Sequence, residues 1–152
     1  MSFNETAANI NATLANFEQL AKGLQDTMRS EMKKIFAAFF AEFPQVKTIH
    51  WTQYTPYFND GEECIFRVGE LWFTATEYTE LRDRECAYGE GDDGLINDYG
   101  AVIEDVNLNS AIDTMERIIN FLPEDVLKTA YGDHAWVRIH KDGADVEEFE
   151  HD

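Results

Sequence analysis

The chain has 152 residues, with 30 acidic and 12 basic side chains and a formal net charge of −18. This length suits one domain with a sizeable hydrophobic core. The shortage of Lys and Arg argues against direct binding of DNA or RNA, because phosphate contacts need clustered bases. No stretch approaches the ~20 apolar residues of a membrane span. The N-terminus lacks the basic and apolar segments of a secretory signal, so we expect a cytoplasmic protein without membrane contact.

The N-terminal residues predict one long amphipathic helix over residues 5–43, capped by Ser2 or Asn4 and ended by Pro44. Unbroken, it would span roughly 58 Å, whereas a small domain is about 30 Å across. Either the helix breaks, with Gly23 the expected place, or its first half projects and packs on another chain. The steps of three and four residues are carried by Ile10, Leu14, Phe17, Ala21, Leu24, Met28, Met32, Ile35, Phe39 and Phe43.

Beyond Pro44 the pattern favours β-structure. Residues 46–54 read as a strand, and residues 64–68 and 71–78 as a hairpin around Gly69-Glu70, a type II′ turn signal. That register gives one apolar face and places Arg67 opposite Trp72, within cation–π reach. The apolar face would comprise Cys64, Phe66, Val68, Leu71, Phe73 and Ala75.

The C-terminal third predicts two helices and a second hairpin. Residues 79–106 read as a long loop that ends in a short strand, residues 108–122 as an amphipathic helix, and Pro123 as the start of a short helix. Residues 134–140 and 144–149 form strands around Asp142-Gly143, with Arg138 placed beside Glu147.

The fold class is therefore α+β. We expect an antiparallel sheet of four to six strands, covered by the second half of the long helix and by helix 108–122. Residues 1–44 form an N-terminal helix that acts as an oligomerisation arm, and residues 45–152 form the α+β body.

Charge is divided unevenly between these two parts. Residues 1–44 hold five acidic and four basic side chains, a net of −1, whereas residues 45–152 hold 25 acidic and eight basic ones, a net of −17. An acidic surface keeps a protein dispersed; the alternative is a polyanion-like surface that occupies a nucleic-acid-binding site on another protein. The acidic surface residues of this second interpretation are Glu90, Asp92, Asp93, Glu147, Glu148 and Glu150.

Aromatic residues are densest between His50 and Phe66, a segment that also contains Pro56 and a turn at Asn59-Asp60-Gly61. Such a segment either anchors a small core or lines a recognition surface. The sequence leaves both alternatives open. The candidate residues for a protein contact or an aromatic pocket are Trp51, Tyr54, Tyr57, Phe58, Arg67 and Trp72.

Catalytic and metal-binding patterns are lacking. His50-Trp51-Thr52 matches one half of a two-histidine phosphodiesterase motif, and no second half follows. The two cysteines and four histidines lack the paired spacing of a zinc site, and the acidic turns do not follow the EF-hand order. We therefore expect no enzymatic activity, no metal and no cofactor.

Two runs, WTQYTPYFNDGEECIFRV and VRIHKDGADVEEFEHD, resemble small, functionally unassigned proteins carried by tailed phages and related bacterial genomes. The resemblance implies an accessory protein of phage type in the host cytoplasm and carries over no site residue. The leading hypothesis is a non-enzymatic acidic protein that docks on and inhibits a host protein, such as a nucleic-acid-binding one, in anti-defence or host takeover. The alternative is a small-ligand protein that sequesters or hydrolyses a nucleotide-like signal in an aromatic-lined pocket.

Overall fold

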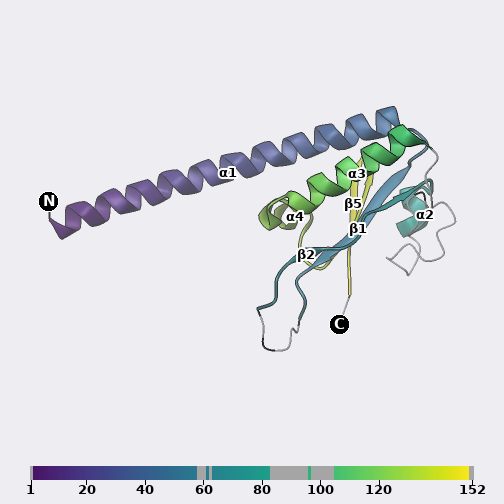
Figure 1. The fold of residues 1–152 in the computed structure, drawn as a ribbon. Coiled ribbons are helices and arrows are strands. Elements are labelled where there is room, and N and C mark those ends of the chain that lie inside the picture. The colour runs from purple at the N-terminus through teal and green to yellow at the C-terminus, as the bar shows by residue number, and fades with distance from the viewer. Residues whose placement is uncertain (1, 58–60, 62, 83–95, 97–104, 151–152) are drawn as a thin grey trace.

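A computed structural model describes residues 2–57, 61, 63–82, 96 and 105–150 (Figure 1). It confirms the α+β class, with a long N-terminal helix, a five-stranded antiparallel sheet and further helices. The elements in chain order are α1 (Phe3–Glu42), β1 (Thr48–Tyr54), β2 (Arg67–Val68), β3 (Trp72–Thr74), α2 (Tyr78–Arg82), α3 (Val106–Phe121), α4 (Glu124–Tyr131), β4 (Ala135–His140) and β5 (Gly143–Glu148).

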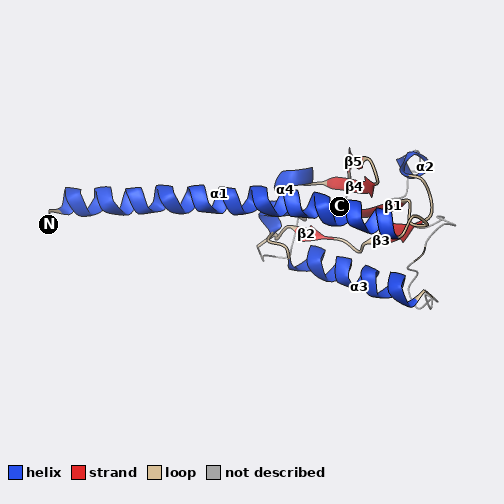
Figure 2. Ribbon diagram, turned by 90° about the horizontal axis from the view of Figure 1, so that it is seen from above, coloured by secondary structure: helices blue, strands red, loops and turns tan. Residues whose placement is uncertain are grey.

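Helices lie on both faces of the sheet, whose strand order is β2-β1-β4-β5 with β3 also paired to β1. Helices α1, α3 and α4 lie over one face, where Val137 and Ile139 of β4 point into the main core (Figure 2). Trp136 points to the opposite face and packs there with Leu81 of α2 and with Phe149. Since successive side chains of a strand alternate between faces, the two clusters are separate.

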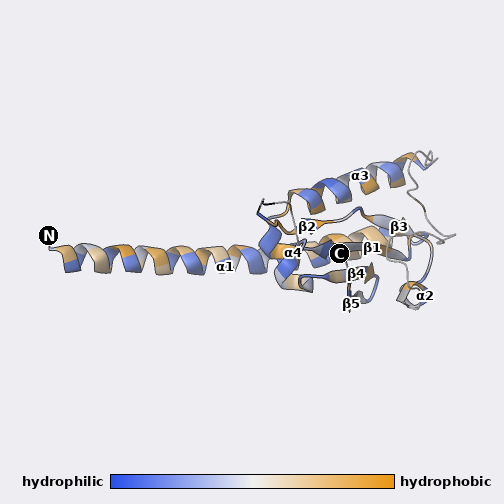
Figure 3. Ribbon diagram, turned by 90° about the horizontal axis from the view of Figure 1, so that it is seen from below, coloured by the Kyte–Doolittle hydropathy of each residue, from blue (hydrophilic) through white to orange (hydrophobic). Residues whose placement is uncertain are grey.

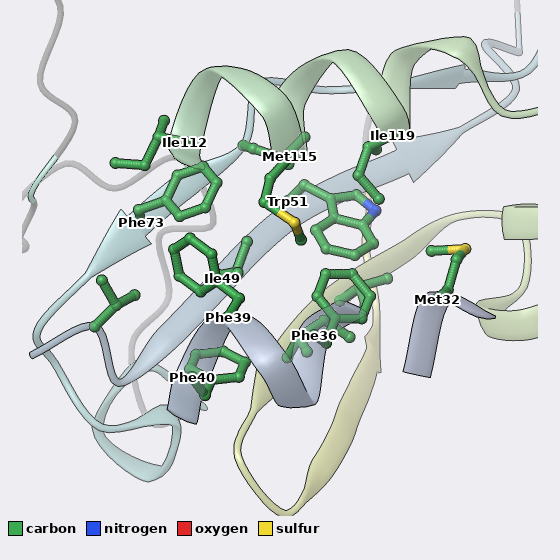
Figure 4. Close-up of a cluster of buried hydrophobic side chains, with 14 of the residues drawn as sticks. Met32, Phe36, Phe39, Phe40, Ile49, Trp51, Phe73, Ile112, Met115 and Ile119 are labelled. Atoms are coloured by element: carbon green, nitrogen blue, oxygen red, sulfur yellow. The ribbon is translucent and has the colours of Figure 1, made fainter. Parts of the chain in front are cut away.

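The main core joins the C-terminal half of α1 to the sheet and to α3 (Figure 4). Phe39 stands 5.6 Å from Phe73 of β3 between ring centroids, and Phe36 stacks on Trp51 of β1 at 6.3 Å. The predicted covering of the sheet by the second half of the long helix and by α3 is therefore confirmed. The same core also contains Met32, Phe40, Ile49, Ile112, Met115 and Ile119, which are labelled in Figure 4.

Helix α1 is a single element over Phe3–Glu42, within two residues of the predicted range 5–43, and Ser2 is its cap. The Ser2 hydroxyl accepts a hydrogen bond from the Glu5 N–H at 3.2 Å, and Phe43 closes the helix ahead of Pro44. The helix continues through Gly23, so the expected break is not observed and the first half projects (Figure 1). Its packing on another chain stays a prediction. The first half extends away from the body (Figure 1), and we call residues 3–28 the arm.

Segment 64–78 differs from the predicted hairpin. Strands β2 and β3 pair with β1 along the same edge and not with each other. Val68 lies opposite Gln53 and Trp72 opposite His50, so the segment holds one residue more than the matching stretch of β1. This arrangement is a β-bulge, and the predicted type II′ turn is wrong.

Gly69 explains why the bulge forms at this position. Its N–H donates to the carbonyl oxygen of Thr52 at 2.7 Å, and a Cβ at Gly69 would stand 3.0 Å from Thr52 Oγ1. A bulge and a two-residue turn both shift the side-chain alternation by one residue. Phe66, Leu71 and Phe73 are therefore all buried in the main core, as the sequence predicts.

The C-terminal hairpin forms with a register that differs by two residues from the predicted one. Arg138 lies opposite Asp145 rather than Glu147, and Lys141-Asp142 make the loop. A shift of two residues leaves every side chain on its expected face.

The two predicted C-terminal helices are confirmed as α3 and α4. The cap of α3 is Asp105, whose carboxylate accepts from the Leu108 N–H at 3.1 Å. Helix α2 begins at the last residue of the predicted strand 71–78 and continues into the stretch predicted as loop. The strand expected over 99–106 falls largely outside the described residues.

Candidate interaction surfaces

Trp51 belongs to the core. Its side chain is 0% exposed, its ring meets Phe36 and Tyr131, and its Nε1 donates to Gln53 Oε1 at 3.0 Å. Of the two alternatives that the sequence leaves open for the aromatic segment, Trp51 therefore takes the core one, because the inward face of β1 is closed by α1, α3 and α4. Burial also raises the pKa of the neighbouring Tyr131 to about 12.

Tyr54 and Tyr57 lie in different environments. Tyr54 points to the opposite face of β1, where its ring meets Phe149 at 5.6 Å. Tyr57 is 66% exposed and stacks on the His134 ring with 4.8 Å between centroids. Phe58 lies outside the described residues. Of the predicted aromatic contacts in the described part of the chain, Tyr57 is thus the one that is well exposed and able to contact a partner.

Arg67 and Trp72 are not neighbours across a hairpin. Arg67 is exposed and lies opposite Tyr54, whereas Trp72 is half-buried and lies opposite His50. The predicted cation–π contact between them is wrong, because both residues pair with β1 along one edge.

The described members of the predicted aromatic set therefore do not converge on one pocket. A hollow of about 370 Å³ lies between α1, α4 and the β4–β5 hairpin, and it is lined in part by Lys33, His140 and Lys141. Among the described residues predicted for an aromatic pocket, none lines this hollow.

Asp133 fixes the loop that carries the Tyr57–His134 stack. Its Oδ1 accepts from the backbone N–H groups of Thr55 and His134 at 2.7 and 2.9 Å, and its Oδ2 accepts from the Thr55 hydroxyl at 2.8 Å. Burial by itself would raise the pKa of Asp133, but these hydrogen bonds outweigh it and hold the pKa below its ordinary value. The carboxylate is a structural anchor rather than a proton carrier.

Arg138 is a buried charge that was not among the site residues predicted from the sequence. Its side chain is 0% exposed, and its Nη1 and Nη2 donate to Asp145 Oδ2 at 2.8 Å and Glu147 Oε2 at 2.7 Å. The guanidinium lies 3.7 Å from the Trp136 ring centroid, and Trp136 Nε1 donates to His50 Nδ1 at 3.3 Å. The sequence did contain a signal for this cluster, because the predicted hairpin places Arg138, Asp145 and Glu147 on the same face.

The predicted acidic surface is only partly a free surface. Glu148 and Glu150 are exposed, whereas Glu147 is tied to buried Arg138. Glu90, Asp92 and Asp93 lie outside the described residues. Other carboxylates extend the exposed acidic surface of the body: Glu63, Glu70, Glu77, Glu80, Asp113, Glu124, Asp125 and Asp142.

The arm carries the longest exposed apolar stripe in the part of the chain that the structure describes (Figure 3). Phe17 is 68% exposed and Leu24 is 67% exposed. Contiguous exposed apolar surface is typical of interaction sites, so the arm is a candidate for one. The full set of large exposed apolar residues on the arm is Phe3, Ile10, Leu14, Phe17, Leu20 and Leu24.

Within the described ranges, no helix is long and apolar enough to cross a membrane, and no three His, Cys, Asp or Glu side chains are grouped to hold a metal ion. Comparisons with protein-family models, with curated proteins and with solved structures found no match.

Proposed function

We propose that this protein is a non-enzymatic binding protein whose acidic body docks on a basic surface of another protein and blocks it. The observation that carries the proposal is the placement of charge. Residues 45–152 hold a net charge of −17, and Arg138, at the centre of the sheet, is buried against two carboxylates instead of offsetting the surface charge.

A basic, nucleic-acid-binding site is the kind of surface that such a body fits. Closely spaced carboxylates present a negative potential that speeds encounter with a basic partner and rejects acidic ones. The resemblance to phage accessory proteins makes a host protein the natural partner, and the host cytoplasm the place of action.

The histidines that a hydrolase would need serve other contacts. His50 is buried and accepts from Trp136 Nε1, His134 stacks on Tyr57, and His140 stacks on Tyr78 with 3.7 Å between centroids. These contacts favour a binding role over acid–base catalysis, which needs imidazoles that can reach a substrate.

The test uses two variants with equal charge changes in different places. Glu148→Gln with Glu150→Gln removes two carboxylates from the body, and Glu5→Gln with Glu18→Gln removes two from the arm. Each protein is immobilised and exposed to bacterial lysate at about 0.05 M salt, where the Debye length is ~14 Å and charge attraction is weakly screened. Retained proteins are then identified and purified, and their association rates are measured.

We expect the body variant to associate several-fold more slowly than the arm variant, because exposed interface charges act mainly on the association rate. We also expect heparin, a polyanion, to release the partner, and affinity to fall steeply as salt rises to about 0.5 M. Affinity that is indifferent to salt, heparin and both variants would refute the proposal.

A further inference from the structure

The arm has a heptad pattern with an internal asymmetry. Two series of positions, each repeating every seven residues, make up its apolar seam. The first series consists of large side chains only, and the second alternates between alanine and a large residue. The first series is Phe3, Ile10, Phe17 and Leu24, and the second is Ala7, Leu14, Ala21 and Met28.

The arm is a poor candidate for a helix that stands alone in water. Its first half is rich in residues with low helix propensity, and isolated helices are marginal even for good sequences. Its helical state therefore calls for packing along the exposed seam. The residues of low propensity are Asn4, Thr6, Asn9, Asn11, Thr13 and Asn16.

We propose that the arm packs antiparallel against the arm of a second copy of this chain. In an antiparallel pair each position of the first series faces one of the second series. One register then pairs Leu14 with Phe17 next to the two-fold axis, and each layer occurs twice by symmetry. Moving outward, the remaining layers are Ala21 with Ile10, Ala7 with Leu24, and Met28 with Phe3.

Side-chain volumes favour this orientation. Each alanine faces a large residue of the second copy, Ala21 against Ile10 and Ala7 against Leu24, so that the layers vary less in volume than those of a parallel pair. A parallel pair would instead place alanine on alanine and phenylalanine on phenylalanine, which alternates voids with crowding.

The register is limited from both ends. A shift of one heptad toward the body sets Glu31 opposite Ala7, and a shift the other way leaves Leu24 and Met28 uncovered. Met28 already packs partly against the main core, so the free seam ends there. The proposed register brings Phe3 of the second copy to this boundary.

Charge favours the same orientation. A parallel pair would hold two bodies of net charge −17 side by side. The antiparallel pair separates Met28 of one copy from Met28 of the other by roughly 37 Å at ~1.5 Å per residue, several times the Debye length of ~8 Å at physiological salt. At the positions flanking the seam, Glu18 is the one charged residue of the arm, so the helices themselves do not repel.

Disulfide trapping distinguishes the orientations. Cys64 and Cys86 are first replaced by serine, and Ile10→Cys and Ala21→Cys are then made separately in that background, one with a size tag. Two cysteines bridge only when their Cα atoms are within about 7 Å. In the proposed pair position 10 meets position 21, whereas positions 21 and 21 of the two copies are roughly 16 Å apart along the axis.

We expect a mixed dimer when the two variants are combined and oxidised, and little dimer from either alone. Bridged dimers from each variant alone, without the mixed species, would establish a parallel pair and overturn the proposal. A wild-type chain that remains monomeric by light scattering at tens of micromolar would overturn it as well.

Small-angle X-ray scattering of the unmodified protein gives an independent result that does not depend on the variants folding. The proposed dimer has two compact bodies at opposite ends of a paired rod, so its pair-distance distribution should have two maxima. A dimer with a single maximum would contradict the antiparallel arrangement.

Discussion

The two halves of α1 share one helical period but have different partners. In the body half, Phe36 and Phe39 are each 5% exposed, whereas in the arm Phe17 is 68% exposed. The body half has a broad apolar face, widened by Phe36 and Phe40 beside the main stripe, and it meets both the sheet and α3. The arm has a narrow seam. The width of an apolar face thus indicates how many neighbours a helix has, one for a seam and several for a broad face.

The arm and the body also differ in charge. The body concentrates negative charge on its surface and buries Arg138, whereas residues 1–44 are close to neutral. A neutral seam suits self-association and a charged body suits docking on a different molecule, so the two parts of the chain are suited to separate contacts.

The largest expected difference between the two regions comes from truncating an aromatic ring in each. Trp51→Ala empties a fully buried site and should destabilise the body by about 3–5 kcal/mol. Phe17→Ala, measured at a concentration where the chain is monomeric, should change body stability by less than about 0.5 kcal/mol. Urea unfolding followed by near-ultraviolet circular dichroism checks both, and equal losses would remove the distinction between arm and body.

A smaller effect is expected from the buried charge. Arg138→Met removes two charge-assisted hydrogen bonds and leaves Asp145 and Glu147 facing each other. Because both carboxylates retain some access to water, we expect a loss of about 1–3 kcal/mol, below that of a fully buried pair. Arg67→Met, at an exposed arginine, should stay within about 0.5 kcal/mol. Urea is the suitable denaturant because it is uncharged. If Arg138→Met leaves the free energy of unfolding unchanged, the ion pairs do not hold β5, and packing on Trp136 alone does.

Substitutions of two glycines, Gly69 in the body and Gly23 in the arm, should change stability in opposite directions. Gly69→Ala places a Cβ 3.0 Å from Thr52 Oγ1 and 3.1 Å from Thr52 O, and it should cost about 1–3 kcal/mol. Gly23→Ala meets nothing within 4 Å and should stabilise the arm by about 0.5–1 kcal/mol through helix propensity. Thermal unfolding of the body should show the loss of stability in Gly69→Ala. Far-ultraviolet circular dichroism should show the gain of arm helicity in Gly23→Ala. A stable Gly69→Ala protein would mean that β2 can move away from β1.

The smallest effect concerns Asp133 and depends on pH. Its folded-state pKa lies below the ordinary value, so the charged carboxylate contributes stability that is fully present above the unfolded-state pKa and is lost as pH falls through the folded-state pKa. Asp133→Asn should therefore cost about 1 kcal/mol near pH 7. The difference from wild type should shrink in acid, as the pH falls below the ordinary Asp pKa of about 3.9. Unfolding titrations near pH 7 and in acid check this, and a difference that is independent of pH would assign the effect to shape rather than charge.

The sequence alone determined three of the four helices in the described residues and the faces of the strands, and it missed α2. Helix α1 from its Ser2 cap to Pro44, the helices near residues 108–122 and 123–132, and the split of Phe66 and Phe73 from Arg67 all follow from local periodicity and capping. These signals act within one turn or one pleat, so they can be recognised without knowledge of the tertiary contacts. Even the wrong turn at Gly69 and the register error at Arg138 kept the faces intact, because both preserve the alternation of side chains.

Only the tertiary structure decided which strands pair with each other. The segment after Gly69 could close on itself as a hairpin or run along β1 as a bulged edge, and the local sequence suits both. Its pairing with β1 depends on backbone groups about 20 residues away in the chain, and on the close approach of Gly69 to Thr52. The same holds for Trp51, whose burial is decided by Phe36 and Tyr131 from two other elements. An aromatic residue carries the same local pattern in a core and on a surface, and the difference lies in what the rest of the fold places above it.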